Sequence, residues 1–120
     1  MIRFRKTTGR GTRRVPGEMN RLERDYAAHL HALQIAGEVY EYQFDAVKLR
    51  LADKTFYTPD FLIMLADGTI EIHEVKGHWE DDARVKIKVA AEMFPFVFRA
   101  VRRPSKSVGW VVETFGGKGV

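Results

Sequence analysis

Residues 58–77 read TPDFLIMLADGTIEIHEVKG, and this stretch decides the fold that we expect for the chain. It holds two runs rich in apolar and β-branched residues, which are typical of strands. Between them stands Asp67-Gly68, a dipeptide that favours the tight turn of a β-hairpin. The sequence therefore predicts two antiparallel strands, over residues 55–65 and 69–76.

Three charges interrupt the apolar pattern of this hairpin near its open end. Alternate residues of a strand share a face, so Glu74 and Lys76 continue the apolar row that runs through Ile72. A turn at residues 67–68 pairs residues whose numbers sum to about 135, which places Asp60 opposite about position 75. Asp60 and Glu74 then converge. Two neighbouring carboxylates repel each other unless a cation lies between them, and a hard divalent cation such as Mg²⁺ is the usual one.

Two further features indicate the chemistry of this position. Pro59 cannot donate to a strand ladder, so it takes the chain before Asp60 out of regular pairing and opens the sheet. Lys76 points to the same pocket, where it can hold or deprotonate a water or neutralise charge on a phosphate. A metal, a water and a cation together suit phosphodiester hydrolysis. Taken singly, each residue also has a structural interpretation, since Asp after Pro is commonly a turn residue and Glu-x-Lys is commonly a solvated ion pair.

Helix and strand patterns surround the hairpin. Asn20 and Glu23 can form a capping box at the start of an amphipathic helix, and Gly37 suits its end. The predicted elements are a helix at 20–36, strands at 39–44, 47–51, 55–65 and 69–76, a helix at 80–93, and strands at 96–101 and 109–115. We expect an α/β fold of the α+β type, with the first four strands in an antiparallel meander.

The composition excludes several classes of protein. At 120 residues the chain suits one domain with a single hydrophobic core. No apolar run approaches the roughly 20 residues of a membrane span, and the N-terminus lacks the apolar segment of a secretory signal. We therefore expect no membrane association and a location in the cytoplasm. The absence of cysteine excludes disulfides and thiolate metal sites.

The positive charge is concentrated in the first 17 residues. This segment carries six cations and no acid, whereas the whole chain has a net charge of +4, so the remainder is net negative by two. We expect residues 1–17 to be a flexible basic arm that binds a polyphosphate, followed by a single domain over residues 18–120. A solvated tail that only aids solubility is the alternative. The residues expected to contact DNA are Arg3, Arg5, Lys6, Arg10, Arg13, Arg14, Lys86, Lys88, Arg102 and Arg103.

Pro59-Asp60 followed by Glu74-x-Lys76 resembles the short motif of the PD-(D/E)xK nuclease superfamily. The wider run of residues 57–95 is similar to small phage-encoded members of this superfamily, and the resemblance covers nearly all of the chain after the basic arm. It implies a restriction-endonuclease-like core, with a central mixed sheet flanked by helices, and an endonuclease activity that depends on Mg²⁺ or Mn²⁺. It also implies that Asp60 and Glu74 are metal ligands and that Lys76 orients or activates the attacking water.

Many members of the superfamily, including the phage endonuclease I type of Holliday-junction resolvase, add a glutamate from the first helix. Glu23 is the best match, and the resemblance makes it a fourth expected catalytic residue and a third expected metal ligand. Seven residues fall about 20° short of two helical turns, so Glu23 flanks the buried stripe that includes Leu30 and can face the sheet. The alternative is that Glu23 only closes the capping box with Asn20. Glu18 and Asp25 are weaker substitutes.

The sequence predicts a Mg²⁺-dependent DNA endonuclease that selects DNA structure, because the basic residues suit phosphates and no base-reading module is visible. A Holliday junction is the substrate that we expect. It is resolved by two paired nicks and the chain has one site, so we expect a homodimer. The apolar candidates for its interface, most of them equally natural as core, are Phe96, Phe98, Trp110, Val112 and Phe115. Two alternatives stay open: a nuclease for nicks, flaps, free ends or RNA, and a protein that binds or assembles on nucleic acid without cutting it.

Overall fold

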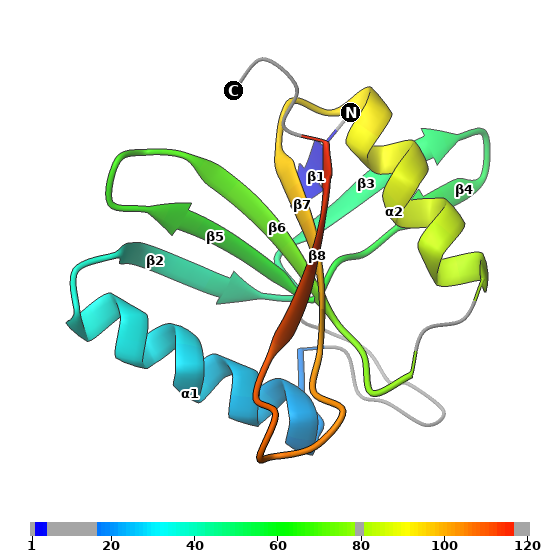
Figure 1. Ribbon diagram of the computed structural model, residues 1–120. Coiled ribbons are helices and arrows are strands. Elements are labelled where there is room, and N and C mark those ends of the chain that lie inside the picture. The colour runs from blue at the N-terminus through cyan, green and yellow to red at the C-terminus, as the bar shows by residue number, and fades with distance from the viewer. Residues whose placement is uncertain (1, 5–16, 79–80, 117–120) are drawn as a thin grey trace.

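The computed structural model describes residues 2–4, 17–78 and 81–116, and Figure 1 shows how their helices and strands are arranged. Within these residues the chain is an α+β protein with two helices and two sheets. Neither of the described helices is long and apolar enough to cross a membrane. The elements are β1 (Ile2–Phe4), α1 (Arg21–Ile35), β2 (Val39–Phe44), β3 (Val47–Ala52), β4 (Thr55–Tyr57), β5 (Phe61–Leu65), β6 (Ile70–Val75), α2 (Asp81–Met93), β7 (Val97–Arg102) and β8 (Val111–Gly116).

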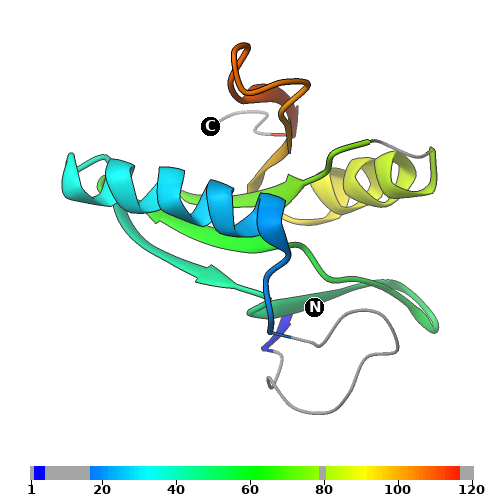
Figure 2. The same cartoon turned by 90° about the horizontal axis from the view of Figure 1, so that it is seen from below.

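The larger sheet has five strands in the order β2-β5-β6-β7-β8. Its neighbouring strands run antiparallel except for β6 and β7, which are parallel, so the sheet is mixed. The segment that contains α2 makes the crossover that this parallel pair requires. Two parallel strands begin at the same end of the sheet, so the chain must return to that end before β7 begins. The smaller sheet has the order β1-β3-β4. Figure 2 shows the smaller sheet on one side of the larger one, with the β7–β8 connection projecting on the other side.

The two helices pack against opposite faces of the larger sheet. Ile72 and Val75 on β6 have opposite parity and therefore point to opposite faces. Ile72 packs with Ile87 of α2, and Val75 packs with Leu30 of α1. Strand β6 thus lies between two cores, so its charged side chains must be accommodated in the interior. The α2-side core contains Val47, Leu49, Tyr57, Ile72, Ile87, Ala90, Phe94, Phe98 and Ala100, and the α1-side core contains Tyr26, Leu30, Val39, Phe61, Ile63, Val75 and Val101.

Both predicted helices and the predicted hairpin turn are present. Asn20 caps α1 with both hydrogen bonds of a capping box. Gly37, just after the helix, has a φ of +87°, a left-handed conformation that glycine adopts without steric cost. The helical spacing of Ile87 and Ala90 in α2 buries both residues. At the hairpin turn Gly68 has a φ of +89°. Local sequence signals therefore placed these elements correctly.

The predicted antiparallel meander has three pairings, of which those between β3 and β4 and between β5 and β6 are confirmed, whereas the one between β2 and β3 is wrong. β2 pairs with β5, while β3 pairs with β1 and β4 in the separate smaller sheet. The single strand predicted over residues 55–65 is interrupted at residues 58–60, where Pro59 has no N–H to donate. The N–H of Asp45 donates to the carbonyl of Asp60 at 2.8 Å and joins the turn after β2 to the start of β5. The interruption separates β4 from β5, so that β3 and β4 form a different sheet. Residues 2–4 do not belong to a flexible arm as expected, because they form β1 and pair with β3.

Most of the apolar residues predicted for a dimer surface belong to the core. Phe98 is fully buried, Phe96 and Phe115 pack against the α2-side core, and Trp110 packs against the α1-side core. Val112 differs from the others, with 46% of its surface exposed. Phe98 is therefore excluded from a dimer surface, whereas the interface expected at the partly buried Phe96, Trp110 and Phe115 and at the exposed Val112 stays a prediction.

Candidate active site

The turn before β5 and the end of β6 bring Asp60 and Glu74 together. Phe61 pairs with His73, a register one residue away from the predicted one, which puts Asp60 across from Glu74. The backbone N–H of Asp60 donates to Glu74 Oε1 at 3.3 Å, and Asp60 Oδ2 accepts from the N–H of Val75 at 2.7 Å. Asp60 is 3% exposed and Glu74 is 6% exposed. The two carboxylates therefore converge in the interior, as the hairpin pattern predicts.

Glu23 in the first turn of α1 reaches the same place. Its side chain accepts from the N–H of Asn20 at 2.9 Å, and Asn20 Oδ1 accepts from the N–H of Glu23 at 2.8 Å. Glu23 is also buried and hydrogen-bonded to Asp60. The two interpretations of Glu23 are therefore compatible, because one carboxylate both caps the helix and contacts the site. The weaker substitutes lie elsewhere, since Glu18 is exposed and Asp25 forms an ion pair with the β7–β8 connection.

Replacing Asn20 with alanine is expected to lower the free energy of unfolding by about 1 kcal/mol, because the N–H of Glu23 loses its acceptor. Chemical denaturation followed by circular dichroism measures this change. Asn20→Ser is the matched control, since serine keeps a side-chain oxygen at the capping position and should stay close to the wild type. An alanine variant as stable as the serine variant would show that the cap contributes nothing to α1.

Lys76 and Tyr57 contact the two oxygens of Glu74. Lys76 Nζ lies 3.2 Å from Glu74 Oε2, and the hydroxyl of Tyr57 donates to Glu74 Oε1 at 3.2 Å. The lysine side chain is 40% exposed and connects the buried carboxylate to solvent. Tyr57 is not among the predicted site residues. The sequence feature that could have indicated Tyr57 is a side-chain hydroxyl at the end of a strand, three residues before Asp60.

A pocket of about 280 Å³ lies beside Glu74. Lys86 of α2, one of the predicted DNA contacts, donates from Nζ to the carbonyl of Phe56 at 3.2 Å and so joins α2 to β4. Glu74 and Lys76 both line this pocket. Its lining residues are Phe56, Tyr57, Thr58, Glu74, Lys76, Asp82, Ala83 and Lys86.

Burial and mutual repulsion change the acidity of these groups. Burial, together with the charges of Glu74 and Glu23, raises the pKa of Asp60 to about 9. Burial also raises the pKa of Glu74, although Lys76 opposes it. For Lys76, burial alone lowers the pKa, but the Glu74 and Asp60 carboxylates outweigh burial and the net shift in pKa is upward. The metal-free site therefore keeps a proton among its carboxylates at neutral pH and keeps Lys76 charged.

The chemistry of the donor set suits a hard divalent cation. Asp60, Glu74 and Glu23 offer oxygen ligands, which Mg²⁺ and Mn²⁺ prefer, and a cation can take the place of the retained proton. In the part of the chain that the structure describes, no three carboxylate or imidazole side chains already have the spacing of a formed metal site. Oε1 of Glu74 accepts from Tyr57 and from the N–H of Asp60, whereas Oε2 lies beside Lys76 and, with two lone pairs, can also bind an ion.

The predicted DNA contacts differ in their surroundings. Lys88 and Arg102 are exposed. Arg103 is less accessible, because it forms an ion pair with Asp25 at 2.7 Å and its guanidinium lies 4.6 Å from the centre of the Trp110 ring. Arg103 therefore ties the β7–β8 connection to α1. The predicted contacts that lie outside the described residues are Arg5, Lys6, Arg10, Arg13, Arg14 and the side chain of Arg3.

No protein-family model, curated protein or solved structure matches the chain. The residues that indicate a function are therefore Asp60, Glu74 and Lys76. Their motif is visible in the sequence, and they contact one another in the structure.

Proposed function

We propose that the protein is a Mg²⁺-dependent, structure-selective DNA endonuclease, built on the restriction-endonuclease-like core of the PD-(D/E)xK superfamily. The observation that carries the proposal is the meeting of the buried Asp60 and Glu74 with Lys76 beside a pocket. A purely structural core has no need for this arrangement, because burying like charges together costs free energy. The mixed sheet, with α2 in the crossover from β6 to β7, is compatible with such a core.

In this proposal Asp60 and Glu74 hold the metal ion, with Glu23 as a third oxygen donor from α1. The bound ion, Mg²⁺ or Mn²⁺, supplies positive charge for a phosphate oxygen and makes a bound water more acidic. Tyr57 orients Glu74 through the 3.2 Å hydrogen bond to Oε1. Because the three carboxylates come from α1, the turn before β5 and β6, the tertiary packing of these elements determines the geometry of the site.

Lys76 acts in this proposal as a cation and not as a general base. Its pKa is raised by Glu74 and Asp60, so the ammonium group stays protonated at neutral pH. An ammonium group can donate to a water and to a phosphate oxygen at the same time. Lys76 therefore orients the attacking water and neutralises the charge that develops on the phosphate during the reaction.

A Holliday junction is the proposed substrate, cut by a homodimer in which each chain supplies one site. The exposed Lys88 and Arg102 and the basic residues 1–17 support phosphate binding without base reading. The proposed location is the cytoplasm, that of the host cell if the chain is phage-encoded. Nicks, flaps, free ends and RNA are alternative substrates. A nucleic-acid-binding or assembly protein that does not cut is the alternative from another class, and the buried Asp60–Glu74 pair argues against it.

The proposal is tested by incubating the protein with a labelled four-way junction, a nicked duplex, a flap, a matched duplex, single-stranded DNA and RNA. Each substrate is presented with Mg²⁺, with Mn²⁺ and with EDTA. We expect cutting that needs the metal and favours the junction, and light scattering on the same samples should show two chains per junction. Preference for a nick, flap or RNA would reassign the substrate. Binding of a substrate without cutting would favour the non-cleaving alternative. The absence of both binding and cutting, for every substrate, would overturn the proposal.

A further inference from the structure

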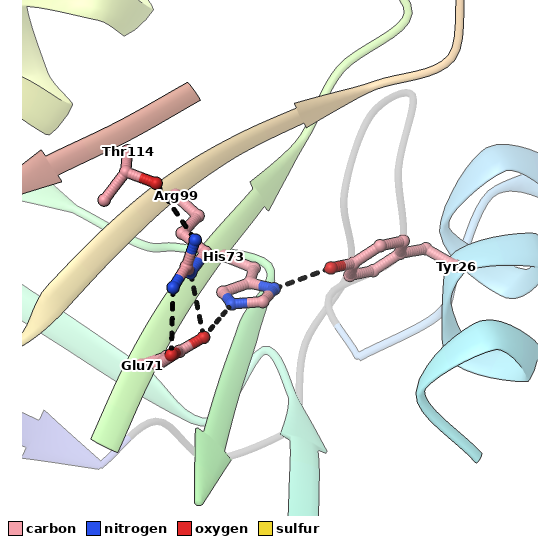
Figure 3. A network of polar contacts seen from close by, with 5 residues as sticks. All are labelled: Tyr26, Glu71, His73, Arg99 and Thr114. Atoms are coloured by element: carbon pink, nitrogen blue, oxygen red, sulfur yellow. Dashed lines mark hydrogen bonds and ion pairs between the residues drawn. The ribbon is translucent and has the colours of Figure 1, made fainter. Parts of the chain in front are cut away.

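A polar network lies on the α1 side of β6, where Tyr26 of α1 reaches His73 (Figure 3). The hydroxyl of Tyr26 lies 2.7 Å from His73 Nδ1, and His73 Nε2 lies 2.8 Å from Glu71 Oε1. Arg99 of β7 donates to both oxygens of Glu71, from Nε at 3.0 Å and from Nη2 at 3.3 Å. Its Nη1 donates to Thr114 Oγ1 of β8 at 3.0 Å. The network therefore links α1, β6, β7 and β8.

One arrangement of protons satisfies these contacts. Burial raises the pKa of Glu71, but its hydrogen bonds to His73 and Arg99 outweigh burial, so the net shift in pKa is downward and the carboxylate is charged. With Glu71 as a charged acceptor, His73 Nε2 is the donor in the contact between them. A neutral ring that donates from Nε2 to Glu71 must accept at Nδ1, and Tyr26 is therefore the donor there. The hydrogen bond from α1 to β6 thus has a fixed direction.

The two ends of this hydrogen bond are close in the chain to the candidate active site. Tyr26 follows Glu23 by three residues, so both lie on the same side of α1 on neighbouring turns. His73 immediately precedes Glu74, and the two project from opposite faces of β6. A movement of α1 relative to β6 therefore changes the distance from Glu23 to Asp60 and Glu74.

The hydroxyl of Tyr26 is the part of this side chain that needs an explanation. The ring makes edge contacts with Phe61, at 5.6 Å between centres, and with Trp110, at 4.9 Å. A phenylalanine would make the same apolar contacts. Satisfying the hydroxyl instead requires His73 and Glu71 to be buried, which costs desolvation free energy that an apolar core avoids. Buried polar networks that are fully satisfied make one packing arrangement more rigid than its competitors.

We propose that the Tyr26–His73–Glu71–Arg99 network positions α1 so that Glu23 stays in contact with Asp60. The inference rests on the proposed function in so far as Glu23 serves a metal ion. Tyr26 and His73 are positioning residues, because they act through Glu23 and contact neither the ion nor the substrate. The alternative is that the network only satisfies polar groups within the α1-side core.

The test removes the hydroxyl of Tyr26 and keeps its ring. Binding of Mn²⁺ to the full chain is measured by electron paramagnetic resonance for the wild type, Tyr26→Phe, Glu23→Gln and the double variant. Tyr26→Phe should weaken Mn²⁺ binding roughly tenfold, the usual scale for losing a hydrogen bond that orients a ligand from outside. In the Glu23→Gln background the same change should have little further effect, because the ligand that it positions is already lost.

Tyr42→Phe is the matched control, since it removes a tyrosine hydroxyl beside the same α1-side core and leaves the network intact. In the metal-free protein, the carboxyl-carbon NMR signals of Glu23 and Asp60 should move in Tyr26→Phe and stay in place in Tyr42→Phe. If the wild type bound no Mn²⁺, the proposed metal site would fail while these signals would still decide the positioning role. Equal loss of Mn²⁺ affinity in both backgrounds, or unmoved carboxyl signals, would overturn the inference. If Tyr26→Phe did not fold, Arg99→Gln would carry the same test from the other end of the network.

Discussion

Replacing Asp60 with asparagine is expected to lower the cleavage rate by roughly 10³-fold or more and to raise the melting temperature of the metal-free protein at neutral pH. Cleavage is lost because the amide cannot bind Mg²⁺ as a carboxylate does. Stability is gained because asparagine removes a buried acid whose pKa is raised to about 9, while its oxygen can still accept from the N–H of Val75. A gain of about 1 kcal/mol in the free energy of unfolding would raise the melting temperature by about 5 °C in a domain of this size.

The difference in stability between Asp60→Asn and the wild type depends on pH, and its direction follows from the raised pKa of Asp60. Asp60 has an ordinary pKa of 3.8, and folding raises that pKa to about 9. The folded protein therefore holds this proton more tightly than the unfolded chain, so the associated stability is fully present below about pH 4 and is lost as the pH rises through about 9. The advantage of Asp60→Asn over the wild type should accordingly grow between these values. Mg²⁺ should reverse the order, because it stabilises only the protein that binds it.

Calorimetry from pH 5 to pH 9, with and without Mg²⁺, measures how the melting temperatures of the two proteins depend on pH and on the metal ion. Asp53→Asn is the matched control, because Asp53 carries the same chemical change at an exposed turn, where its side chain is 84% accessible. It should leave both cleavage and melting temperature close to those of the wild type. An Asp60→Asn protein that melts below the wild type throughout this range would contradict the interpretation of Asp60 as a destabilising functional residue.

Replacing Lys76 with alanine is expected to lower the cleavage rate by roughly 10³-fold while DNA binding in Ca²⁺ stays close to that of the wild type. The ammonium group is the cation 3.2 Å from Glu74, beside the pocket, whereas the predicted phosphate contacts lie mostly elsewhere on the chain. Single-turnover cleavage and filter binding on the same junction separate the two effects. Parallel loss of binding and cleavage would contradict a purely chemical role for Lys76.

Lys76→Arg distinguishes the two tasks assigned to this side chain. Arginine keeps the positive charge but spreads it over a wider, planar group. Activity well above that of the alanine variant would indicate that charge neutralisation is the main task. Activity as low as that of the alanine variant would indicate that the position of one donor beside the water matters more. Wild-type activity in Lys76→Ala itself would remove this residue from the proposed mechanism.

The sequence by itself determined the features that depend on neighbouring residues. The turn at Gly68, the capping box at Asn20 and the left-handed Gly37 follow from preferences that act over a few residues. Strand parity then put Glu74 and Lys76 on one face, and the hairpin register brought Asp60 within one residue of its observed partner. These parts of the candidate site could be predicted because both strands belong to one hairpin.

Only the tertiary structure decided which distant segments meet. The patterns of β2 and β3 are those of half-buried strands, but no local preference specifies that β2 pairs with β5 while β3 joins β1 and β4. Glu23 could be predicted as a cap from its neighbours, whereas its hydrogen bond to Asp60 depends on where α1 crosses the sheet. The same holds for Tyr57 on Glu74 and for the network from Tyr26 to Arg99. Such contacts join residues far apart in the chain, and their stability comes from burial in a shared core, which exists only once the whole sheet and both helices are packed.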